Sequence, residues 1–275
     1  MSDRVIVTLA DGIAEVTMNR ADKRNALDGD MFLALEEAGE RLKTESGVRA
    51  VVLHGDGKSF CAGLDMSSMT ALANAGDQEQ RDAQSSRNGN PGRIDADSIT
   101  HLGQQVCWVW QEIPVPVIAA VHGHALGGGL QIALGADIRI VHPDTKMSVR
   151  EVYWGLVPDM TGTFQLSKLV RPDVARELTY TARIFSGAEG HEMGLATRLS
   201  EDPLADARAL AAQIAANSPG AVRGAKEAFS LMDHEGAAEQ FAAERRLIGA
   251  QIGSANQMEA VMASFENREP NFTDV

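Results

Sequence analysis

The alternation of apolar and polar positions predicts strands at the start of the chain. Two β-prone runs, Val5 to Leu9 and Ile13 to Met18, flank Asp11-Gly12, a pair typical of a tight hairpin turn. A helical stripe follows, in which apolar residues recur 4, 3 and 4 positions apart and so share one face of a helix. These residues are Met31, Leu35, Ala38 and Leu42. The next run, Val48 to His54, is typical of a buried strand, so strands and helices alternate.

The alternation continues to about residue 150. The pattern predicts a helix over Ile99 to Trp110, a buried strand over Val117 to Val121, a short helix over Leu130 to Leu134, and strands over Ile138 to Val141 and Met147 to Val149. Between these two blocks, residues 74–98 are rich in polar residues and contain Pro91-Gly92, which indicates a loop. We expect this loop to cover a binding site and to become ordered with ligand, as mobile lids do.

The remainder of the chain is predicted to be helical. Ser186 to Glu189 has the form of a capping box at a helix start, and Ser218-Pro219 marks a second start. Gly194 and Gly253 are expected to end or bend helices. Strands first and helices last predict an α/β core over residues 1–201 and a helical region over residues 202–275 that docks on a neighbouring subunit.

Composition narrows the class of protein. The 275 residues are 44% hydrophobic and 23% charged, as expected for a packed globular protein, and carry a formal charge of −13. This acidic balance, without a run of Lys and Arg, disfavours nucleic acid as a partner. The most apolar stretch, Ile113 to Leu130, contains two prolines and two histidines, so we expect no membrane span. Two cysteines and a start without a signal-peptide pattern favour a cytoplasmic location.

Three segments can carry chemistry, and the first is Ser59 to Met66. Small residues here follow a strand, so a ligand can approach the backbone, and amides at the start of a helix are ready hydrogen-bond donors. Asp65 is in position to cap that helix. The alternative is a plain strand-to-helix turn. Cys61 is a weak candidate nucleophile, since buried cysteines usually pack as small hydrophobic residues.

The second segment, His122 to Gln131, contains three consecutive glycines after an apolar strand. Such a run has a high conformational-entropy cost, which argues for close approach of the backbone to a ligand or to another chain. It lacks the Lys-Ser/Thr of a phosphate-binding loop and the spacing of the dinucleotide fingerprint. His122 and His124 without further ligands in register are a weak indication of a metal site, so we expect none.

The third segment, Val149 to Thr163, sets two acids among aromatic and aliphatic residues. A carboxyl group in such surroundings tends to have a raised pKa, which suits a group that transfers protons near neutral pH. The alternative is structural: Glu151 pairs with Arg150 or Arg139, and Asp159 caps a helix that begins near Met160.

Together, in this order and spacing, the three segments closely resemble the crotonase superfamily, also called the enoyl-CoA hydratase/isomerase family. The likeness spans nearly the whole chain. Asn19 to Leu27 is similar to the family's first loop, Ser186 to Gly194 to its S-A-x-E-A-x-x-x-G-L segment, and Phe265 to Phe272 to its C-terminal tail. The resemblance implies a core of repeated ββα turns forming a superhelix, with a C-terminal helical region that builds trimers, often paired into hexamers.

The resemblance also implies a site for an acyl-CoA thioester. Two backbone amides, those of Leu64 and Gly128, form an oxyanion hole that stabilises the enolate of the thioester, and no metal or redox cofactor is needed. Coenzyme A enters as part of the substrate. Its binding residues are expected to be Ala62 and the cations Lys23 and Arg24, which act as point charges near the phosphates.

The reaction depends on three positions. Family hydratases use two glutamates on one water; here the second is Glu151, but the first position is Gln131, which cannot transfer a proton at neutral pH. Asp159 lies where dienoyl-CoA isomerases of the family carry an aspartate. We therefore favour dienoyl-CoA isomerisation, in which Asp159 removes a γ- or ε-type proton, Glu151 delivers one to the α carbon and Gln131 steers substrate or water. The alternatives are a 2-enoyl-CoA hydratase, an acyl-CoA binding protein with little catalysis, and a thioester hydrolase or carbon-carbon lyase on the same scaffold.

Aromatic residues are candidates for the walls of the acyl pocket, although such residues more often form core or interface. They are Trp108, Trp110, Tyr153 and Trp154.

Overall fold

A six-stranded sheet forms the centre of the computed structural model, which describes residues 3–65, 89–94, 98–234 and 236–272. Its spatial order is β1-β2-β3-β4-β6-β9, with β1 and β2 antiparallel and the other pairs parallel. The strands are β1 (Val5–Ala10), β2 (Ile13–Met18), β3 (Ala50–Gly55), β4 (Val117–Val121), β6 (Ile138–Val141) and β9 (Arg198–Leu199). The predicted hairpin is confirmed, with Asp11 and Gly12 both at positive φ in its turn.

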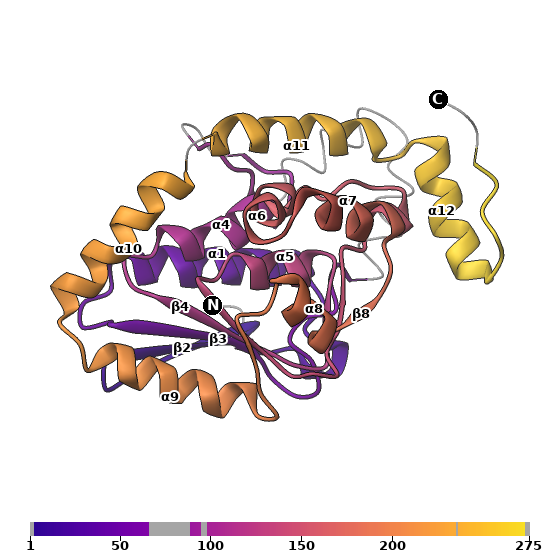
Figure 1. Ribbon diagram of the computed structural model, residues 1–275. Coiled ribbons are helices and arrows are strands. Elements are labelled where there is room, and N and C mark those ends of the chain that lie inside the picture. The colour runs from indigo at the N-terminus through magenta and orange to yellow at the C-terminus, as the bar shows by residue number, and fades with distance from the viewer. Residues whose placement is uncertain (1–2, 66–88, 95–97, 235, 273–275) are drawn as a thin grey trace.

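Helices cover both faces of this sheet (Figure 1). On one side lie α1 (Gly29–Thr44), α4 (Leu102–Glu112) and α5 (Gly128–Leu134), and on the other lies α9 (Pro203–Ala215). The strands alternate accordingly: Val51 and Leu53 belong to the main core, whereas Ala50 and Val52 pack with Ala207 of α9. Because both faces are covered, the parallel strands are apolar at nearly every position.

A second, smaller sheet lies beside the first and positions the glycine-rich turns. It contains β5 (His124–Leu126), β7 (Lys146–Ser148) and β8 (Phe185–Ser186), in that order. The predicted capping box is confirmed at α8 (Gly187–Met193), where Ser186 and Glu189 satisfy each other's backbone amides, and Gly194 ends that helix in the left-handed conformation. Of two short 3-10 turns, η1 (Ala21–Lys23) precedes these elements in the chain and η2 (Glu151–Trp154) lies between β7 and β8.

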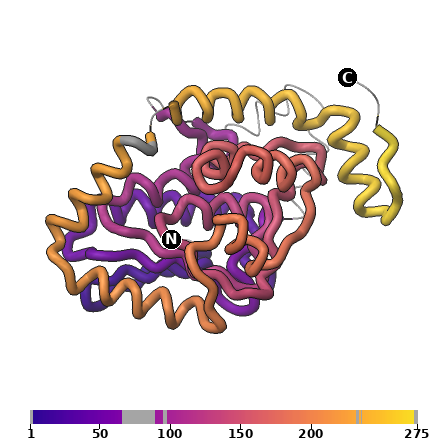
Figure 2. The backbone as a smooth tube through the Cα atoms, in the orientation of Figure 1, coloured from indigo at the N-terminus to yellow at the C-terminus, as the bar shows by residue number. Residues whose placement is uncertain are grey.

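Beyond residue 160 the chain is mostly helical, as predicted. It runs through α6 (Gly162–Leu169), α7 (Pro172–Thr181), α10 (Pro219–Asp233), α11 (Ala237–Gln251) and α12 (Ala255–Glu266). The tube in Figure 2 shows α10 passing along one end of the molecule and α11 crossing over α6 and α7. The last helix, α12, contacts η2, where Tyr153 and Ser264 share a hydrogen bond. The region after residue 201 thus includes α9 on the sheet and α11 over the core, and its docking on another subunit stays a prediction.

The elements differ from their predicted bounds in ways that have physical causes. The predicted helix over Ile99 to Trp110 begins only at Leu102, because the His101 side chain accepts from the Gln104 amide and closes a capping box there. The predicted helix at Leu130 begins at Gly128, because the glycine triplet itself turns into the helix. Most of the predicted loop at residues 74–98 lies outside the described residues. None of the described helices is long and apolar enough to cross a membrane.

Candidate active site

A pocket of about 390 Å³ brings the three segments of chemical interest together. It collects residues from the first two glycine-containing turns, from the stretch after β7, and from α11. Its lining includes Ala62, Gly63, Leu64, Gly127, Gly128, Glu151, Trp154, Asp159, His101, Arg245, Ile248 and Ile252. Among the sequence-predicted site residues, Leu64, Gly128, Glu151, Asp159 and Ala62 therefore share one cavity.

The two glycine-containing turns lie side by side. Cys61 forms a parallel bridge with Ala125, and the Leu126 amide donates to the Cys61 carbonyl at 3.2 Å. A methyl group on Gly129 would collide with that same carbonyl, so only glycine permits this approach. Gly63, at φ +87°, lies so close to the second turn that a Cβ there would come within 2.6 Å of the Leu126 carbonyl oxygen.

The amides of Leu64 and Gly128, the predicted oxyanion-hole donors, lie in these two adjacent turns. Gly63 accepts from the Leu27 amide at 2.8 Å and the Asp65 amide donates to the Leu27 carbonyl at 2.9 Å. Because successive amides of an extended segment point to opposite sides, the Leu64 N–H points away from Leu27. Gly128 is the first residue of α5, and the first amides of a helix have no acceptor within it.

Glu151 is a buried carboxyl group with one engaged oxygen. It begins η2 directly after β7, is 8% exposed, and its Oε1 accepts from Gln131 Nε2 at 2.6 Å. For Oε2, the described residues supply no hydrogen-bond partner. Burial, as the largest cause, raises the pKa of Glu151 to about 7, against the lowering effect of the hydrogen bonds. Oε2 is therefore the oxygen of this buried carboxyl group that no described residue engages.

Gln131 is fully engaged with the protein. The side chain is 1% exposed, and besides donating to Glu151 its Oε1 accepts from the amides of Met160 and Gly162, at 3.0 and 2.8 Å. It positions Glu151 and the loop that follows Asp159. Gln131 thus acts here as a support between the two acids rather than as an open site for water.

Asp159 faces the same pocket from the start of that loop. Its side chain is 23% exposed, and burial, followed by the charges of Glu151 and Glu244, raises its pKa well above the ordinary value. Asp159 does not cap a helix, which corrects the structural alternative: α6 begins at Gly162 after Thr161, and no side chain caps it.

Glu244 fixes the loop from the side opposite Gln131. This buried carboxylate of α11 accepts from the amides of Thr161 and Thr163, at 3.0 and 3.2 Å, and from the Thr163 hydroxyl and Gln104 Nε2. Together with Gln131 it holds the four successive amides of residues 160–163, alternating from one side to the other. Glu244 was not among the residues predicted for the site, since nothing in its helical surroundings in the sequence distinguishes it from other glutamates.

The cations expected near coenzyme A lie on an exposed loop beside the first turn. Lys23 ends η1 and Arg24 follows it, both exposed, and the Ala62 amide donates to the Arg24 carbonyl at 3.0 Å. Ala62 lines the pocket, whereas Lys23 and Arg24 do not. The structure therefore sets the two cations next to the pocket wall and leaves their role a proposal.

The structure decides two of the alternatives raised by the sequence: an ion pair of Glu151 with an arginine, and Cys61 as a nucleophile. Arg139 donates to backbone carbonyls at Leu195 and Ala136, and Arg150 to that of Ala182, so neither pairs with Glu151. Burial raises the pKa of the Cys61 thiol to about 12, which removes it as a nucleophile.

The remaining candidates divide between pocket and core. His122 and His124 contact the turn after β3, at Gly57 and Ser59, and within the described part of the chain no cluster of metal-ligating residues occurs. Of the four aromatic residues, Trp154 lines the pocket, Trp108 and Trp110 are core, and Tyr153 is exposed.

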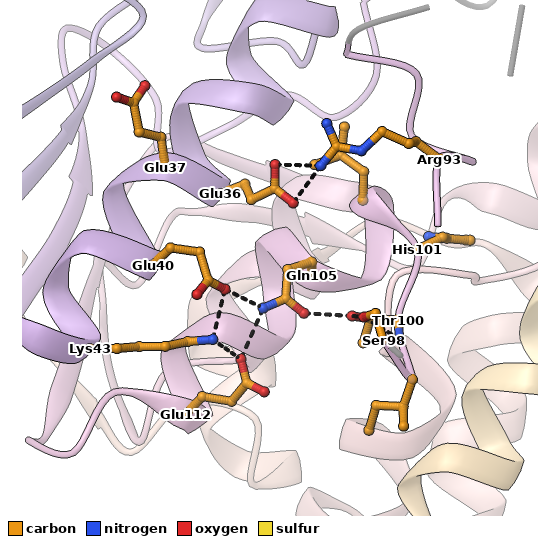
Figure 3. A pocket seen from close by; sticks show the side chains of 12 residues that line it. Glu36, Glu37, Glu40, Lys43, Arg93, Ser98, Thr100, His101, Gln105 and Glu112 are labelled. Atoms are coloured by element: carbon orange, nitrogen blue, oxygen red, sulfur yellow. Dashed lines mark hydrogen bonds and ion pairs between the residues drawn. The ribbon is translucent and has the colours of Figure 1, made fainter. Parts of the chain in front are cut away.

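A second hollow adjoins the pocket and shares His101 with it (Figure 3). Two sets of its charged groups form ion pairs: Glu36 with Arg93, and Lys43 with both Glu40 and Glu112. The hollow is therefore braced by ion pairs between α1, α4 and the segment before α4.

Comparison with known proteins places this architecture in a family. The family model described as enoyl-CoA hydratase/isomerase matches residues 8–275. A probable enoyl-CoA hydratase of Bacillus subtilis is 30% identical over 254 residues, 90% of each chain, and a short-chain-enoyl-CoA hydratase of Clostridium acetobutylicum is 31% identical over 270 residues, 97% of this chain and 96% of its own. The crystal structure of an enoyl-CoA hydratase/isomerase from Pseudoalteromonas atlantica superimposes with a TM-score of 0.82 at 26% identity, covering 98% of this chain and all of the other. The chain belongs to the enoyl-CoA hydratase/isomerase family, the crotonase superfamily, and has the crotonase fold.

Proposed function

We propose that this enzyme of enoyl-CoA chemistry isomerises double bonds in a dienoyl-CoA thioester. The observation that carries the proposal is the pairing of two acids in one pocket with an engaged Gln131 between them. Glu151 and Asp159 both line the cavity, whereas the amide of Gln131 serves three protein groups. Glu151 and Asp159 thus offer two carboxyl groups to a conjugated acyl chain in the pocket. The position of the second glutamate of a hydratase is occupied by Gln131.

The proposed reaction is a shuttle of one proton out and one proton in. From a 2,4-dienoyl ester, ionised Asp159 removes a proton from the ε carbon, or from the γ carbon of a 2-enoyl ester, and the electron pair moves through the conjugated chain to the thioester oxygen. Protonated Glu151 then delivers its proton from Oε2 to the α carbon, and the double bonds settle in their new positions. Atoms and charge balance, since Asp159 ends protonated and Glu151 ionised. A 3,5-dienoyl ester passes through the same steps in reverse: ionised Glu151 takes the α proton, and protonated Asp159 delivers one to the ε carbon.

The electrostatics support a pair of carboxyl groups that shares one proton. Burial raises the pKa of both acids, and the charge of Glu151 raises that of Asp159 further. Two such groups do not ionise together near neutral pH, so the pair keeps one acid and one base and titrates as a unit.

The proposed enolate is stabilised by the amides of Leu64 and Gly128, as an oxyanion hole on the thioester oxygen. Each donor in such a hole contributes about 3 to 4 kcal/mol to the transition state. Proton transfer of this kind requires neither a metal nor a redox cofactor. Lys23 and Arg24, with the Ala62 backbone, are proposed to hold the coenzyme A part of the substrate.

Hydration of a 2-enoyl-CoA is the second candidate, favoured by the relatives at 29–31% identity that are named as hydratases. Hydratases of the family use two carboxyl groups to hold and activate one water. Here Glu151 has an oxygen without a described partner, but Gln131 supplies no second proton-transferring group.

The test offers the purified enzyme 2-enoyl-CoA, 3-enoyl-CoA and 3,5-dienoyl-CoA and follows the absorbance of each. Isomerisation of the dienoyl ester with little hydration supports the proposal; rapid hydration of the 2-enoyl ester without isomerisation refutes it. Tight binding of all three esters without turnover would identify an acyl-CoA binding protein instead.

Single variants then separate the two acids. Asp159→Asn is expected to lower isomerisation at least about a hundredfold, because it removes the base while keeping the shape of the side chain. The control is Asp144→Asn, which changes an exposed aspartate of the same charge. Full activity of Asp159→Asn on every substrate would show that the residue has no catalytic role.

We also propose that the chain forms a homotrimer, or a hexamer built from two trimers. The exposed apolar side chains of α10 and α12, among them Phe229 and Met262, support an assembly. Light scattering on the eluted protein gives the mass, and a monomer of 29.4 kDa would refute the assembly.

A further inference from the structure

His101 has one ring nitrogen committed to the backbone. Its Nδ1 accepts from the Gln104 amide at 3.0 Å, as the side-chain half of the capping box of α4. A nitrogen that accepts an N–H carries no proton itself, so the proton of the neutral ring resides on Nε2. The capping contact therefore fixes the tautomer and leaves Nε2–H as a donor.

That donor faces Asp159. The Nε2 atom lies 3.7 Å from Asp159 Oδ2, and both residues line the pocket. The ring is 4% exposed and forms part of the wall between the pocket and the neighbouring hollow, where Figure 3 shows it at the end of α4. A distance of 3.7 Å is longer than a hydrogen bond, but catalytic hydrogen bonds of a free enzyme often shorten when substrate binds.

The ring and the acid are held by one buried network. Gln104 accepts from the His101 amide and donates to Glu244, which in turn accepts from the Thr161 amide two residues after Asp159. Both partners of the contact are thus fixed relative to α11 and to each other. A displacement of the ring would also displace the start of α4.

We propose that His101 is a positioning residue that acts through Asp159, donating its Nε2–H to the carboxylate and so favouring the ionised base. The inference rests on the proposed function, in which Asp159 is the base. Without the donor, Asp159 is left facing the charges of Glu151 and Glu244, which favour its protonated form.

The surroundings keep His101 neutral while Asp159 changes charge. Burial, with a smaller effect of the Arg245 charge, lowers the pKa of His101 to about 4. The titratable and charged groups around the pair are Glu151 from η2, Glu244 and Arg245 from α11, and Cys107 from α4. Near neutral pH the ring thus donates one hydrogen bond without adding a charge.

Two substitutions separate the two nitrogens of the ring. His101→Asn keeps an acceptor at the position of Nδ1, and Asn is a favoured capping residue, but no donor reaches Asp159. His101→Gln extends an amide to the position of Nε2 and loses the cap. For His101→Asn we expect an unchanged Tm, an acid limb of kcat/KM shifted up by about one pH unit, and a rate at neutral pH lowered about tenfold. For His101→Gln we expect a Tm lower by about 2 to 4 °C and a rate within about threefold of the parent enzyme.

The reverse pattern, with His101→Asn fully active and His101→Gln impaired, would show that the ring only caps α4 and would overturn the proposal. Equal losses in both variants would do the same. In an Asp159→Asn background, His101→Asn should change the rate less than about twofold, since the effect passes through Asp159. A full tenfold loss in that background would contradict the proposed route.

An infrared readout keeps the inference separate from the proposed reaction. The carboxylic-acid band of Asp159, obtained by subtracting the Asp159→Asn spectrum, titrates with pH in the enzyme without substrate. We expect its midpoint to lie about one pH unit higher in His101→Asn. An unmoved midpoint overturns the role of His101 whichever substrate the enzyme turns over, whereas a moved midpoint without isomerisation overturns the proposed reaction alone.

Discussion

Replacing Glu151 by Gln is expected to change how the free energy of unfolding depends on pH. Burial raises the pKa of this carboxyl from the ordinary value of 4.5 to about 7. The folded protein therefore holds the Glu151 proton more tightly than the unfolded chain does. The stability from this difference is fully present below about pH 4.5 and is lost as the pH rises through about 7.

The magnitude follows from the interval between the two pKa values. At 1.36 kcal/mol per pH unit it amounts to about 3 kcal/mol between pH 4.5 and pH 8. Gln at this position can still accept from Gln131, and it never ionises. The parent enzyme should therefore lose about 3 kcal/mol of stability relative to Glu151→Gln over this range.

The assay is urea unfolding followed by circular dichroism, at half-unit steps of pH and one protein concentration. The exposed Glu227→Gln is the control, and its difference from the parent should stay flat. Because the Glu151 charge also raises the pKa of Asp159, the series is repeated in an Asp159→Asn background. A Glu151→Gln difference that varies by less than about 1 kcal/mol from pH 5 to pH 8 would refute the reasoning, since it would mean that Glu151 is hydrated in the folded protein.

Three further substitutions probe the site. Gly129→Ala should destabilise by about 1 to 3 kcal/mol and abolish activity, because the methyl group would separate the turns at the Cys61 carbonyl; unfolding and rate are measured. Glu244→Ala should cost about 3 kcal/mol by urea unfolding, since it leaves buried amides without their acceptor. Gln131→Glu should raise hydration of 2-enoyl-CoA about a hundredfold in the absorbance assay, because it adds a second titrating carboxyl against Glu151.

Each of these has a matched control. Gly224→Ala, where a methyl group meets open space on an exposed helix, should not destabilise. Glu239→Ala removes an exposed acid from the same helix as Glu244 and should cost under about 0.5 kcal/mol. The gain from Gln131→Glu should vanish when Glu151 is also changed to Gln. A Glu244→Ala protein as stable as Glu239→Ala would contradict the role given to that carboxylate.

The parts of the fold that could be predicted from the sequence are those determined by residues close together in the chain. The hairpin at Asp11-Gly12 follows from the left-handed backbone that Gly tolerates, and the buried strand Val117 to Val121 from its unbroken apolar run. The resemblance found the two glycine turns, and the structure brings them into contact. Strand and helix ends that depend on these local causes lie within a few residues of their predicted positions.

The parts that could not be predicted depend on contacts between distant residues. Gln131 and Glu244 are 29 and 83 positions from amides that they bind, and no periodicity encodes such a pairing. His101 lies in a polar stretch and ends up buried only because its ring caps α4 between the pocket and the hollow. Three pocket residues of α11, Arg245, Ile248 and Gly249, and Ile252 just after it were not predicted for the same reason, since this helix was expected to be a peripheral tail.

The bond from Glu244 to the loop after Asp159 also has a temporal consequence. A ribosome delivers the strands and the glycine turns first, and α11 only near the end of synthesis. Until then the amides of Thr161 and Thr163 lack the Glu244 carboxylate to which they donate hydrogen bonds in the folded protein. The nascent protein can thus build its sheet early, but the proposed proton-transferring centre is completed among the last parts of the chain to emerge.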